Sequence, residues 1–529
     1  MQLDALFSPG SVAIVGASQN PQKVGGMPLQ LLQRLGYDGP IYPVNPAASE
    51  VQGLTAFASI DALPAQIDLA IVALPAIGVE GAIEQLIAQR ARAAIVLSSG
   101  FAEMGDAGAA TQTRIAERAR ASGLALLGPN CLGVMNIRRK LFATFSPAPL
   151  AGVPQPGDVA IVSQSGAFGA YAFSLARKGG LGLSHWVTTG NEAAVSVADV
   201  IDWLADDADT RVILAYIEGA RDGAALQRAL AKARAAGKPV IVTKVGRTEA
   251  GARAAMSHTA SLSGEDAVYQ AVFDATGAIR ARTVEEMFRL GQAFATGGLP
   301  AGRRLGIVTV SGGVGTLMAD SASDLGLELP ALPESVAAPL RERIPFCATQ
   351  NPIDVTGQVT ADLPVLGLAA RGAATSGAYD ALVLFVAAAL ASPVLAPSIV
   401  AMVRETVAAA PQVPTALCGI ADEATRQALL ACGCLVFEEP THAVEVLAAK
   451  AKWAEHRIEA SPPRPAPLEV APAVLNEADA LRFFAGIGVP AAPHHRVHSP
   501  DDAVAAWQSL GGQAVMKIVS ADLLHKSDV

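Results

Sequence analysis

A histidine within a stretch of small, polar residues is the side chain of this sequence best suited to chemistry. The stretch, residues 257–266, reads SHTASLSGED and follows the apolar run 239–243. Ser263 and Asp266 have the spacing of a capping box, so we expect a helix to begin there, with His258 on the loop before it. An exposed imidazole can act as a nucleophile or carry a proton near neutral pH. On the local sequence alone, a surface histidine without a role is the more common explanation.

A glutamate at the end of a predicted strand is the partner that we expect for this histidine. Residues 212–217 form an apolar run, and Glu218-Gly219 closes it. A carboxylate at the carboxyl end of a parallel strand faces the crevice, where it can hold an imidazole in one tautomer or balance its charge. A solvated glutamate at a strand end is an equally good interpretation if His258 is left aside.

Short apolar runs alternate with helical stretches through residues 1–145, which predicts a parallel α/β domain. Several of these runs end in Gly, Ser, Pro or Asn, and ligands of open parallel sheets bind at such strand ends. The strands that we expect here are 11–15, 41–44, 69–73, 94–97 and 124–127.

The first strand-to-helix turn lacks a complete G-x-G-x-x-G pattern. Gly16 with Gly25-Gly26 suits either a phosphate-bearing ligand at a helix N-terminus or a plain tight turn. Dinucleotide-binding domains usually end the second strand with an acidic residue that binds the ribose, and Asn45-Pro46 stands there instead. The sequence therefore disfavours an NAD-dependent oxidoreductase.

Two further α/β units follow, and in each a strand runs into a helix through small residues. This turn is 163–169 in the second unit, which extends to about residue 295, and 311–315 in the third, about 300–455. Such helix starts leave backbone N–H groups open to an anion, although close helix–strand packing also explains the glycines of the third unit. The strands that we expect are 159–162, 185–188, 212–217, 239–243, 305–310 and 381–387.

Two proline-rich segments separate these units from their neighbours. Residues 148–157 have the composition of a linker, and residues 461–474 carry five prolines, which is typical of an extended interdomain linker. After the second linker we expect helices from Asn476 and Ser499 and a strand over 514–519.

Composition and charge argue against several classes of protein. The 529 residues are 51% hydrophobic, but the longest apolar runs, such as 381–391, fall short of the ~20 residues of a membrane helix. No Lys or Arg precedes Lys23, so we expect neither a signal peptide nor a membrane location. The net charge of −9 disfavours nucleic acid as a partner. Five cysteines without a second CxC pair, and His494, His495 and His498 without an acidic partner, predict no metal site and a reducing, cytoplasmic location.

Taken in order along the chain, these motifs resemble the NDP-forming acyl-CoA synthetases, the superfamily of succinyl-CoA synthetase and ADP-forming acetate–CoA ligase. The first unit is similar to the family's CoA-binding domain, and the turn 163–166 is similar to the phosphate-binding helix start of its second domain. His258 lies where the family carries its phosphorylated histidine, and Glu218 lies where a carboxylate supports it. The motifs that carry the resemblance are 12–18, 42–46, 98–101, 128–133, 163–166, 257–259, 311–315, 351–354 and 517–528.

The resemblance implies an α/β fold of three consecutive parallel-sheet domains followed by the start of an ATP-grasp domain. The expected division is a Rossmann-like CoA-binding domain (1–147), two flavodoxin-like domains (148–297 and 298–457), a linker (458–474) and an incomplete ATP-grasp portion (475–529). The residues expected to bind CoA are Gly16, Ser18, Lys23, Asn45, Pro46, Ser98, Ser99, Gly100 and Asn130. The residues expected to bind phosphate, at two helix starts that we expect to converge on His258, are Ser163, Ser165, Gly166, Ser311, Gly312 and Gly313.

The implied activity joins a small carboxylic acid to CoA through an acyl phosphate and a phosphohistidine, with ATP or GTP and Mg²⁺ as further requirements. Family members with a fused ATP-grasp domain continue well past the position of Val529, so we expect this chain alone to catalyse only the half-reactions of His258 and CoA. A homo-oligomer or a partner subunit with an ATP-grasp domain is expected. The alternative is a regulatory module that binds CoA or acyl-CoA without catalysis, and it needs no phosphorylatable histidine.

Overall fold

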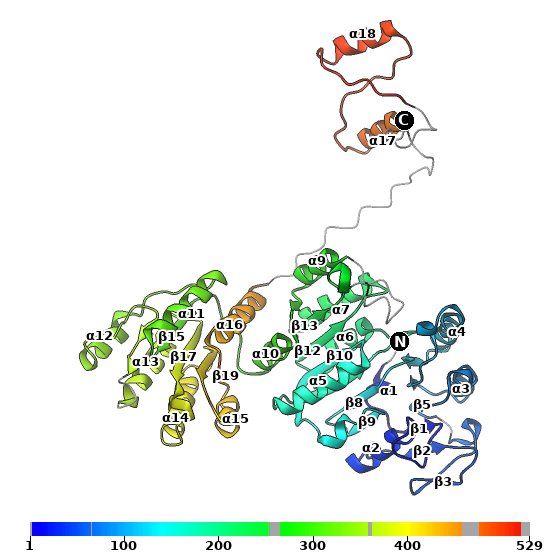
Figure 1. Cartoon of the computed structure of the whole chain (residues 1–529), viewed down its shortest axis with the longest axis horizontal. Helices are drawn as coiled ribbons and strands as arrows, with labels where there is room; N and C mark the ends of the chain where they lie inside the picture. The colour runs from blue at the N-terminus through cyan, green and yellow to red at the C-terminus, as the bar shows by residue number, and fades with distance from the viewer. Residues whose placement is uncertain are drawn as a thin grey trace. The chain divides into compact units, whose positions relative to one another are not determined.

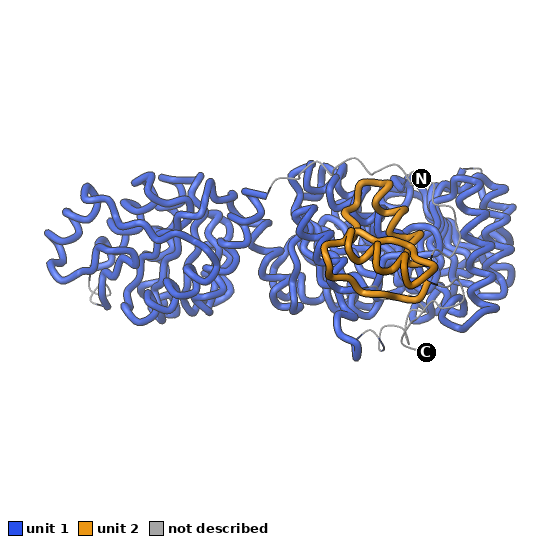
Figure 2. The backbone as a smooth tube through the Cα atoms, turned by 90° about the horizontal axis from the view of Figure 1, so that it is seen from above, with its two compact units in different colours: residues 1–459 blue, residues 460–529 orange. Residues whose placement is uncertain are grey.

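The computed structural model of the chain describes residues 3–64, 66–251, 253, 265–357, 362–456 and 476–519. The chain divides into two compact units, Met1–Glu459 and Ala460–Val529, which Figure 2 shows in blue and orange. The predicted phosphohistidine with its neighbours at 254–264, the linker at 457–475 and residues 520–529 lie outside the described residues. The described part of the first unit contains three large sheets built mainly from parallel strands, as the sequence predicts, and a two-stranded antiparallel sheet of β3 Glu50–Val51 and β4 Leu54–Thr55.

The first sheet has five parallel strands in the order β2-β1-β5-β6-β7. Strands β1, β5 and β6 are buried along their whole length, which explains their unbroken runs of Val, Ile, Leu and Ala. The strand order reverses between β1 and β5, so a ligand crevice is expected at the carboxyl ends of these two strands. The elements are β1 Val12–Val15, α2 Met27–Leu35, β2 Ile41–Val44, β5 Leu69–Val72, α3 Ala76–Ala88, β6 Ala93–Val96, α4 Asp106–Ser122 and β7 Ala125–Leu127 (Figure 1).

The second sheet has seven strands in the order β14-β13-β12-β10-β11-β8-β9. Its strands β8 and β9 form an antiparallel hairpin that the sequence analysis did not foresee. They lie within the range 1–147, yet β8 pairs antiparallel with β11 and so extends the second sheet. The elements are β8 Gly133–Asn136, β9 Leu141–Thr144, β10 Pro156–Ser163, α5 Gly166–Lys178, β11 Leu183–Thr188, α6 Val197–Asp206, β12 Val212–Ile217, α7 Gly223–Ala235, β13 Val240–Lys244, α9 Asp266–Thr276, β14 Ile279–Arg280 and α10 Val284–Ala295.

The third sheet has five parallel strands in the order β16-β15-β17-β18-β19. The motif 351–354, whose role the sequence left open, supplies the edge strand β16. The Asn351 amide accepts from the N–H of Ile307 and donates to the carbonyl of Leu305, which fixes the motif to β15. The elements are β15 Leu305–Thr309, α11 Gly312–Asp324, α12 Glu334–Arg343, β16 Ile353–Asp354, α13 Leu363–Thr375, β17 Ala381–Ala387, α14 Ala396–Ala409, β18 Thr415–Gly419, α15 Glu423–Ala431, β19 Leu435–Phe437 and α16 Pro440–Glu455.

Helix α16 joins the second and third sheet domains. The buried ammonium of Lys450 donates to the carbonyls of Ala293 (2.8 Å) and Thr296 (2.9 Å) at the end of α10. Phe294 of α10 and Trp453 of α16 pack edge to face in one apolar cluster that includes residues of both domains. The contact between α10 and α16 therefore combines buried apolar side chains with hydrogen-bonded carbonyls at the end of α10.

One local expectation was wrong, and another cannot be compared with the structure. Helix α9 begins at Asp266, with Glu265 as its N-cap residue, and Ser263 of the expected capping box lies outside the described residues. The segment 148–157 is not a loose linker: it forms the short 3-10 helix Ala148–Ala151 and the start of β10, and Pro149 is buried. Its prolines suit a tight turn as well as an extended chain.

The second unit contains two described helices, α17 Glu477–Gly486 and α18 Pro500–Ser509. Asn476 and Ser499 cap them by accepting N–H groups from the third residue of each helix, as the sequence predicts. The expected strand over 514–519 is wrong, because the described part of this segment carries no strand. An apolar run forms a strand only where another strand accepts its hydrogen bonds, and two helices offer none.

Candidate functional site

The loop after β1 is shaped by backbone approaches that leave no space for side chains. Gly16 has φ +86°, and a Cβ there would lie 2.8 Å from the carbonyl oxygen of Ala73. A Cβ on Gly25 would lie 2.0 Å from the carbonyl oxygen of Gly16, and one on Gly26 would meet Asn20. The three glycines therefore close the turn onto itself and bring it against the end of β5.

The polar residues predicted beside this turn mostly hold the loop together. The Asn45 amide donates to the carbonyl of Ala17 (2.9 Å), and the Ser18 hydroxyl accepts from the N–H of Asn20. Lys23 and Pro46 are exposed at the same carboxyl edge. Asn45 thus positions the β1 turn, while Lys23 supplies a cation that faces solvent.

A second group of predicted residues surrounds the ends of β6 and β7. The Ser98 hydroxyl donates to the carbonyl of Leu74, and Ser99 is exposed. Gly100 has φ +107°, and its N–H donates to Glu103 (2.6 Å). The exposed Asn130 has φ +58°, and its N–H donates to the carbonyl of Ser98. The two loops are therefore fixed to each other at one edge of the sheet.

Two exposed apolar side chains at this edge were not predicted as site residues. Ile77, in the first turn of α3, is 97% exposed, and Met104, in the loop after β6, is 74% exposed. Both follow carboxyl ends of neighbouring strands, where a ligand of an open parallel sheet binds. Their position in the turns 75–78 and 98–105, shortly after buried strands, is the signal that the sequence offers.

The start of α5 is capped and tightly packed. Ser165 is the N-cap residue, and its hydroxyl accepts from the N–H of Phe168 (3.3 Å). The buried Ser163 hydroxyl donates to the carbonyl of Ser165 (2.7 Å), which braces the turn. Gly166 is needed because a Cβ there would lie 2.9 Å from Leu132. These contacts leave the first N–H groups of the helix, whose partial positive charge favours an anion, at the carboxyl edge of the second sheet.

Gln164 joins this helix start to the predicted carboxylate. Its amide oxygen accepts from the N–H groups of Glu218 (2.5 Å) and Gly219 (3.0 Å), and its amide nitrogen donates to the carbonyl of Gly219 (2.7 Å). Glu218 is half-buried, whereas the sequence suggested an exposed strand end. The structure thus brings the Ser163–Gly166 turn and Glu218 together, as expected for one site.

The loop after β11 carries a buried glutamate that the sequence analysis missed. Glu192 is 6% exposed and has φ +54°. Its carboxylate accepts from the N–H of Val197 (2.8 Å) and the hydroxyl of Thr189 (2.9 Å). Burial raises the pKa of Glu192 to about 7. The two hydrogen bonds, the side chain of Gln164 and the charge of Arg221 act in the opposite direction and lower it.

A buried lysine also lies at this edge. Lys244 ends β13, and its ammonium lies 4.5 Å from the centre of the Tyr269 ring, whose hydroxyl accepts from the N–H of Ala220. Burial lowers the pKa of Lys244 to about 8, opposed by Asp266 and Glu218. The chain leaves β13 here and continues into the segment that contains His258.

The start of α11 differs from that of α5. Ser311 is its N-cap residue but makes no side-chain cap, and Gly312 and Gly313 are exposed. A Cβ on Gly312 would lie 3.0 Å from a carboxylate oxygen of Asp354. An anion at this helix start would therefore meet a negative charge. The described contacts of α5 with the third sheet domain involve its C-terminal end, where Arg426 donates to Gly179, so convergence of the two helix starts stays a prediction.

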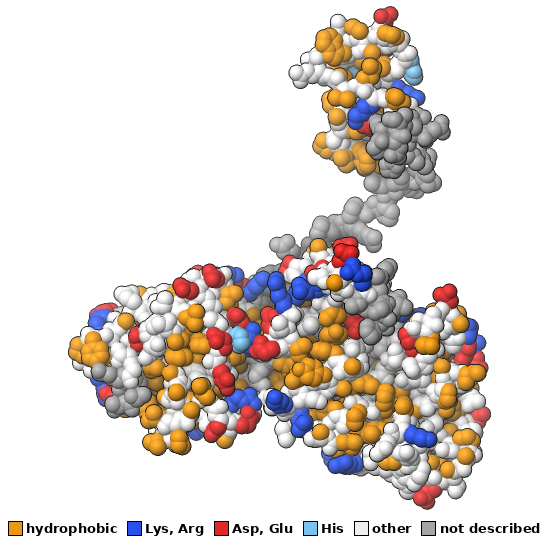
Figure 3. Space-filling view, in the orientation of Figure 1, with side chains coloured by type: hydrophobic (Ala, Val, Ile, Leu, Met, Phe, Trp, Pro, Cys, Tyr) orange, Lys and Arg blue, Asp and Glu red, His pale blue; other side chains and the backbone are white. Residues whose placement is uncertain are grey.

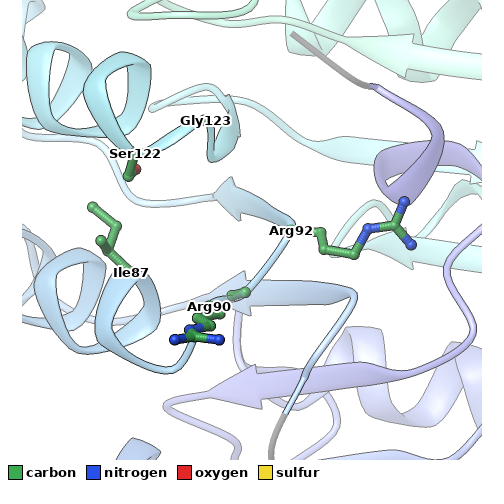
Figure 4. Close-up of a pocket in the computed structure, with 6 residues that line it drawn as sticks. Ile87, Arg90, Arg92, Ser122 and Gly123 are labelled. Carbon is green, nitrogen blue, oxygen red and sulfur yellow. The ribbon is translucent and has the colours of Figure 1, made fainter.

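Two pockets in the described part of the first unit differ in their place relative to the strand ends, where ligands of open parallel sheets bind. Figure 4 shows a pocket of about 250 Å³ lined by Ile87, Arg90, Ser122 and Gly123; it lies where β6 and β7 begin, opposite the predicted CoA site. Another pocket, of about 220 Å³, lies at the carboxyl edge of the second sheet. Its lining includes Gln164, Glu192, Ser196, Gly219, Arg221 and Arg120.

On the face of the first unit in Figure 3, basic and acidic side chains are interspersed, without the single-sign surface typical of nucleic-acid binding. Among the described residues, no three His, Cys, Asp or Glu side chains gather as metal ligands. None of the described helices is long and apolar enough to cross a bilayer.

Comparison with known proteins assigns every part of this architecture. Residues 10–137 match the CoA binding domain, 156–294 the succinyl-CoA ligase like flavodoxin domain, 305–459 the ligase-CoA domain and 468–529 the ATP-grasp domain. The structure of the dinucleotide forming acetyl-coenzyme A synthetase 1 of Ca. Korarchaeum cryptofilum, in complex with phosphate and ADP, is 31% identical. It has a TM-score of 0.78 and covers 86% of this chain and 97% of that one.

Two relatives identify the chemistry. Subunit alpha of the ADP-forming acetate–CoA ligase I of Pyrococcus furiosus is 35% identical over 86% of this chain and 98% of its own length. The ADP-forming acetate–CoA ligase I of Archaeoglobus fulgidus is 32% identical over 100% of this chain and 77% of its own length. The chain belongs to the NDP-forming acyl-CoA synthetase family and is an acid–CoA ligase of the ADP-forming type.

Proposed function

We propose that His258 carries the phosphoryl group in this ligase and that Glu218 supports its imidazole. The observation that carries the proposal is the single cluster formed by the start of α5, Gln164 and the Glu218–Gly219 turn. Lys244, the last residue of β13, lies at the same edge and precedes the segment with His258 in the sequence. The cluster combines an anion-binding helix start with a carboxylate that can orient an imidazole, which are the two things that phosphoryl transfer to histidine requires.

Read in the direction from acyl-CoA, the reaction has two steps. A phosphate oxygen attacks the thioester carbonyl, the C–S bond breaks, and CoA leaves as a thiolate that takes up a proton. The neutral imidazole then attacks phosphorus, a P–N bond forms, and the P–O bond to the acyl group breaks to release the carboxylate. The helix start of α5 favours the phosphoryl anion by about 0.3–1 kcal/mol, and more where it is partly buried.

We propose that CoA binds at the carboxyl edge of the first sheet. Its phosphates are assigned to the turn with Gly16, Ser18 and Lys23, and its pantetheine chain to the loops with Ser98-Ser99-Gly100 and Asn130. The exposed Ile77 and Met104 add apolar contacts for the uncharged part of the ligand. Calorimetric titration with CoA tests this: Ile77→Ser should weaken binding severalfold, while Val394→Ser, at an 80% exposed position of the third sheet domain, should not.

The remaining partners follow from the relatives and from the second unit. The substrate is a small carboxylic acid, and acetate is the acid of the two relatives. We propose that the chain assembles with a partner subunit or with further copies of itself, since one relative is itself a subunit alpha. The described residues contain no cluster suited to Mg²⁺, so no residue is assigned to it. The five free cysteines support a cytoplasmic location.

Phosphate labelling tests the proposal directly. With acetyl-CoA and radioactive phosphate, the chain should acquire an acid-labile, base-stable label that disappears in His258→Ala. Glu218→Gln should lower the labelling rate while the thermal unfolding temperature stays close to that of the unsubstituted chain, because the change removes charge and keeps shape. A label that survives His258→Ala would place the phosphoryl carrier elsewhere, and CoA binding without any label would favour a regulatory module.

A further inference from the structure

The segment after β11 belongs to the second sheet domain, yet it follows the edge of the first sheet. Three N–H groups of residues 191–195 donate to carbonyls of residues 126–129, at the end of β7. The pairs are Asn191 with Pro129 (2.9 Å), Ala193 with Gly128 (2.9 Å) and Val195 with Leu126 (3.1 Å). A Cβ on Gly190 would lie 2.4 Å from the carbonyl oxygen of Asn130, so glycine is needed for this approach. These contacts fix the backbone of Asn191 against the first domain.

The side chain of Asn191 uses all of its hydrogen-bonding groups at the predicted CoA edge. Its amide nitrogen donates to a carboxylate oxygen of Glu103 and to the side-chain oxygen of Gln112 (3.0 Å). Its amide oxygen accepts from the side-chain nitrogen of Asn130 (3.2 Å). The Gln112 oxygen also accepts from the N–H of Ala102 (3.3 Å), so both partners of the Asn191 nitrogen are acceptors. The amide of Asn191 therefore fits in one orientation only.

Glu103 connects Asn191 to the loop after β6. Its other carboxylate oxygen accepts from the N–H of Gly100 (2.6 Å). Burial raises the pKa of Glu103, but hydrogen bonds that include those from Gly100 and Asn191 outweigh burial and hold the pKa below its ordinary value. Glu103 is therefore an ionised acceptor at neutral pH. A continuous chain of hydrogen bonds runs from Gly100 through Glu103 and Asn191 to Asn130, and both of its ends are residues assigned to CoA.

We propose that Asn191 is a positioning residue for CoA, supplied by the second sheet domain to a site on the first. It sets the separation of the loops after β6 and β7, to which the pantetheine chain is assigned. The inference rests on the proposed CoA site, because the separation of these loops affects binding only if the ligand lies there. The CoA site is then a property of both domains rather than of the first sheet alone.

The backbone of the two loops explains why such a brace matters. Gly100 has φ +107° and Asn130 has φ +58°, so both loops turn through left-handed backbone at the residues assigned to the ligand. Loops that are fixed before binding lose little conformational entropy when the ligand arrives, whereas loose loops must be ordered by the ligand. Loss of the Asn191 contacts should therefore weaken CoA binding while the sheet stays folded.

A reciprocal exchange of donor and acceptor tests the proposal in the full chain, with CoA affinity measured by calorimetry. Asn191→Asp places a carboxylate against that of Glu103 and should weaken CoA binding about tenfold. Glu103→Gln keeps one acceptor for two donors, the Gly100 N–H and the Asn191 amide, and should weaken binding about fivefold. The combined variant again places a donor opposite an acceptor, so its affinity should return to within about threefold of the native value.

The exchange also separates positioning from a simple effect of charge. CoA is an anion, so removal of the negative charge of Glu103 would by itself tighten binding. The weakening predicted for Glu103→Gln has the opposite sign. Gln85→Glu, at an exposed position of α3, adds a negative charge to the same domain and should change the affinity by less than about twofold. All titrations are made below the thermal unfolding temperature of every variant.

The outcomes distinguish this inference from the proposed CoA site. Unchanged or tighter binding in Glu103→Gln, or a combined variant as weak as Asn191→Asp, would overturn the role of Asn191. Unchanged CoA binding in Ile77→Ser would remove the proposed site and this inference with it. Weaker binding in Ile77→Ser together with native affinity in Asn191→Asp would leave the proposed site standing and refute only the role of Asn191.

Discussion

Glu192 and Lys450 are both buried ionisable side chains with a pKa near 7, but they lie in different kinds of place. Lys450 lies on the regular helix α16, and its ammonium donates to two carbonyls at the end of α10. Glu192 has left-handed backbone, lines a pocket and belongs to a loop between two predicted sites. A shifted pKa alone is therefore no sign of function; backbone strain and an open pocket beside the group are what distinguish the two.

The comparison predicts that substitution of Lys450 lowers the stability of the fold without changing the chemistry. The largest effect on stability is expected at this position. Lys450→Met removes a charge-assisted donor from the carbonyls of Ala293 and Thr296, and Ala293 still accepts from the N–H of Thr296. A buried unsatisfied carbonyl at Thr296 costs about 1–3 kcal/mol, to which the lost bond to Ala293 adds. We expect a loss of about 2–4 kcal/mol in the free energy of unfolding, measured by denaturant titration, with unchanged labelling per folded chain. Lys452→Met, at an exposed position of the same helix, should change stability by less than about 0.5 kcal/mol. A strong loss of labelling in folded Lys450→Met would remove the distinction.

The pH dependence of stability should have opposite signs at the two positions. The folded pKa of Glu192 lies above its ordinary value, so its contribution is complete below pH 4.5 and is lost as pH rises towards about 7. Glu192→Gln should remove this loss, which corresponds to about 3 kcal/mol. The folded pKa of Lys450 lies below its ordinary 10.5, so its contribution is complete above pH 10.5 and is lost as pH falls towards about 7. Chemical unfolding at pH 5, 8 and 10 measures both; a native-minus-variant difference at Glu192 that is constant over pH would contradict the burial argument.

The smallest predicted effect concerns CoA. Asn191→Ala removes the amide that joins the β11 loop to Glu103 and Gln112, so the CoA edge should lose part of its order. We expect about fivefold weaker CoA binding by calorimetry, in line with about 1 kcal/mol for such hydrogen bonds. Lys450→Met serves as the control, because Lys450 lies between α16 and α10 and makes no described contact with the CoA edge. Equal weakening in both variants would show a general loss of stability.

The buried strands were predictable because they are continuous apolar runs, and their observed bounds differ from the predicted ones by a few residues at most. The hairpin β8–β9 was not, because Gly133–Asn136 and Leu141–Thr144 flank the basic turn 138–140 and have no distinctive period. Strand 514–519 was predicted wrongly, because an apolar run does not reveal whether a pairing strand is available.

The site was predictable where strands end in small or polar residues, as at Gly16, Ser163–Gly166 and Glu218. The loop 189–192 was missed because Thr-Gly-Asn-Glu has the composition of an ordinary turn. Only its position directly after a buried strand marks it as part of the ligand edge. That Glu192 is buried and has a left-handed backbone depends on contacts between distant segments, which no local pattern encodes.

Release of acetate from acetyl-CoA is the measurement that tests the account most directly. If phosphate forms an acyl phosphate and His258 then takes the phosphoryl group, the chain should release about one acetate per molecule, and only when phosphate is present. His258→Ala should release almost none, while His498→Ala, at an exposed histidine of the second unit, should behave like the native chain. An equal burst in His258→Ala, or release without phosphate, would contradict a phosphohistidine at this site.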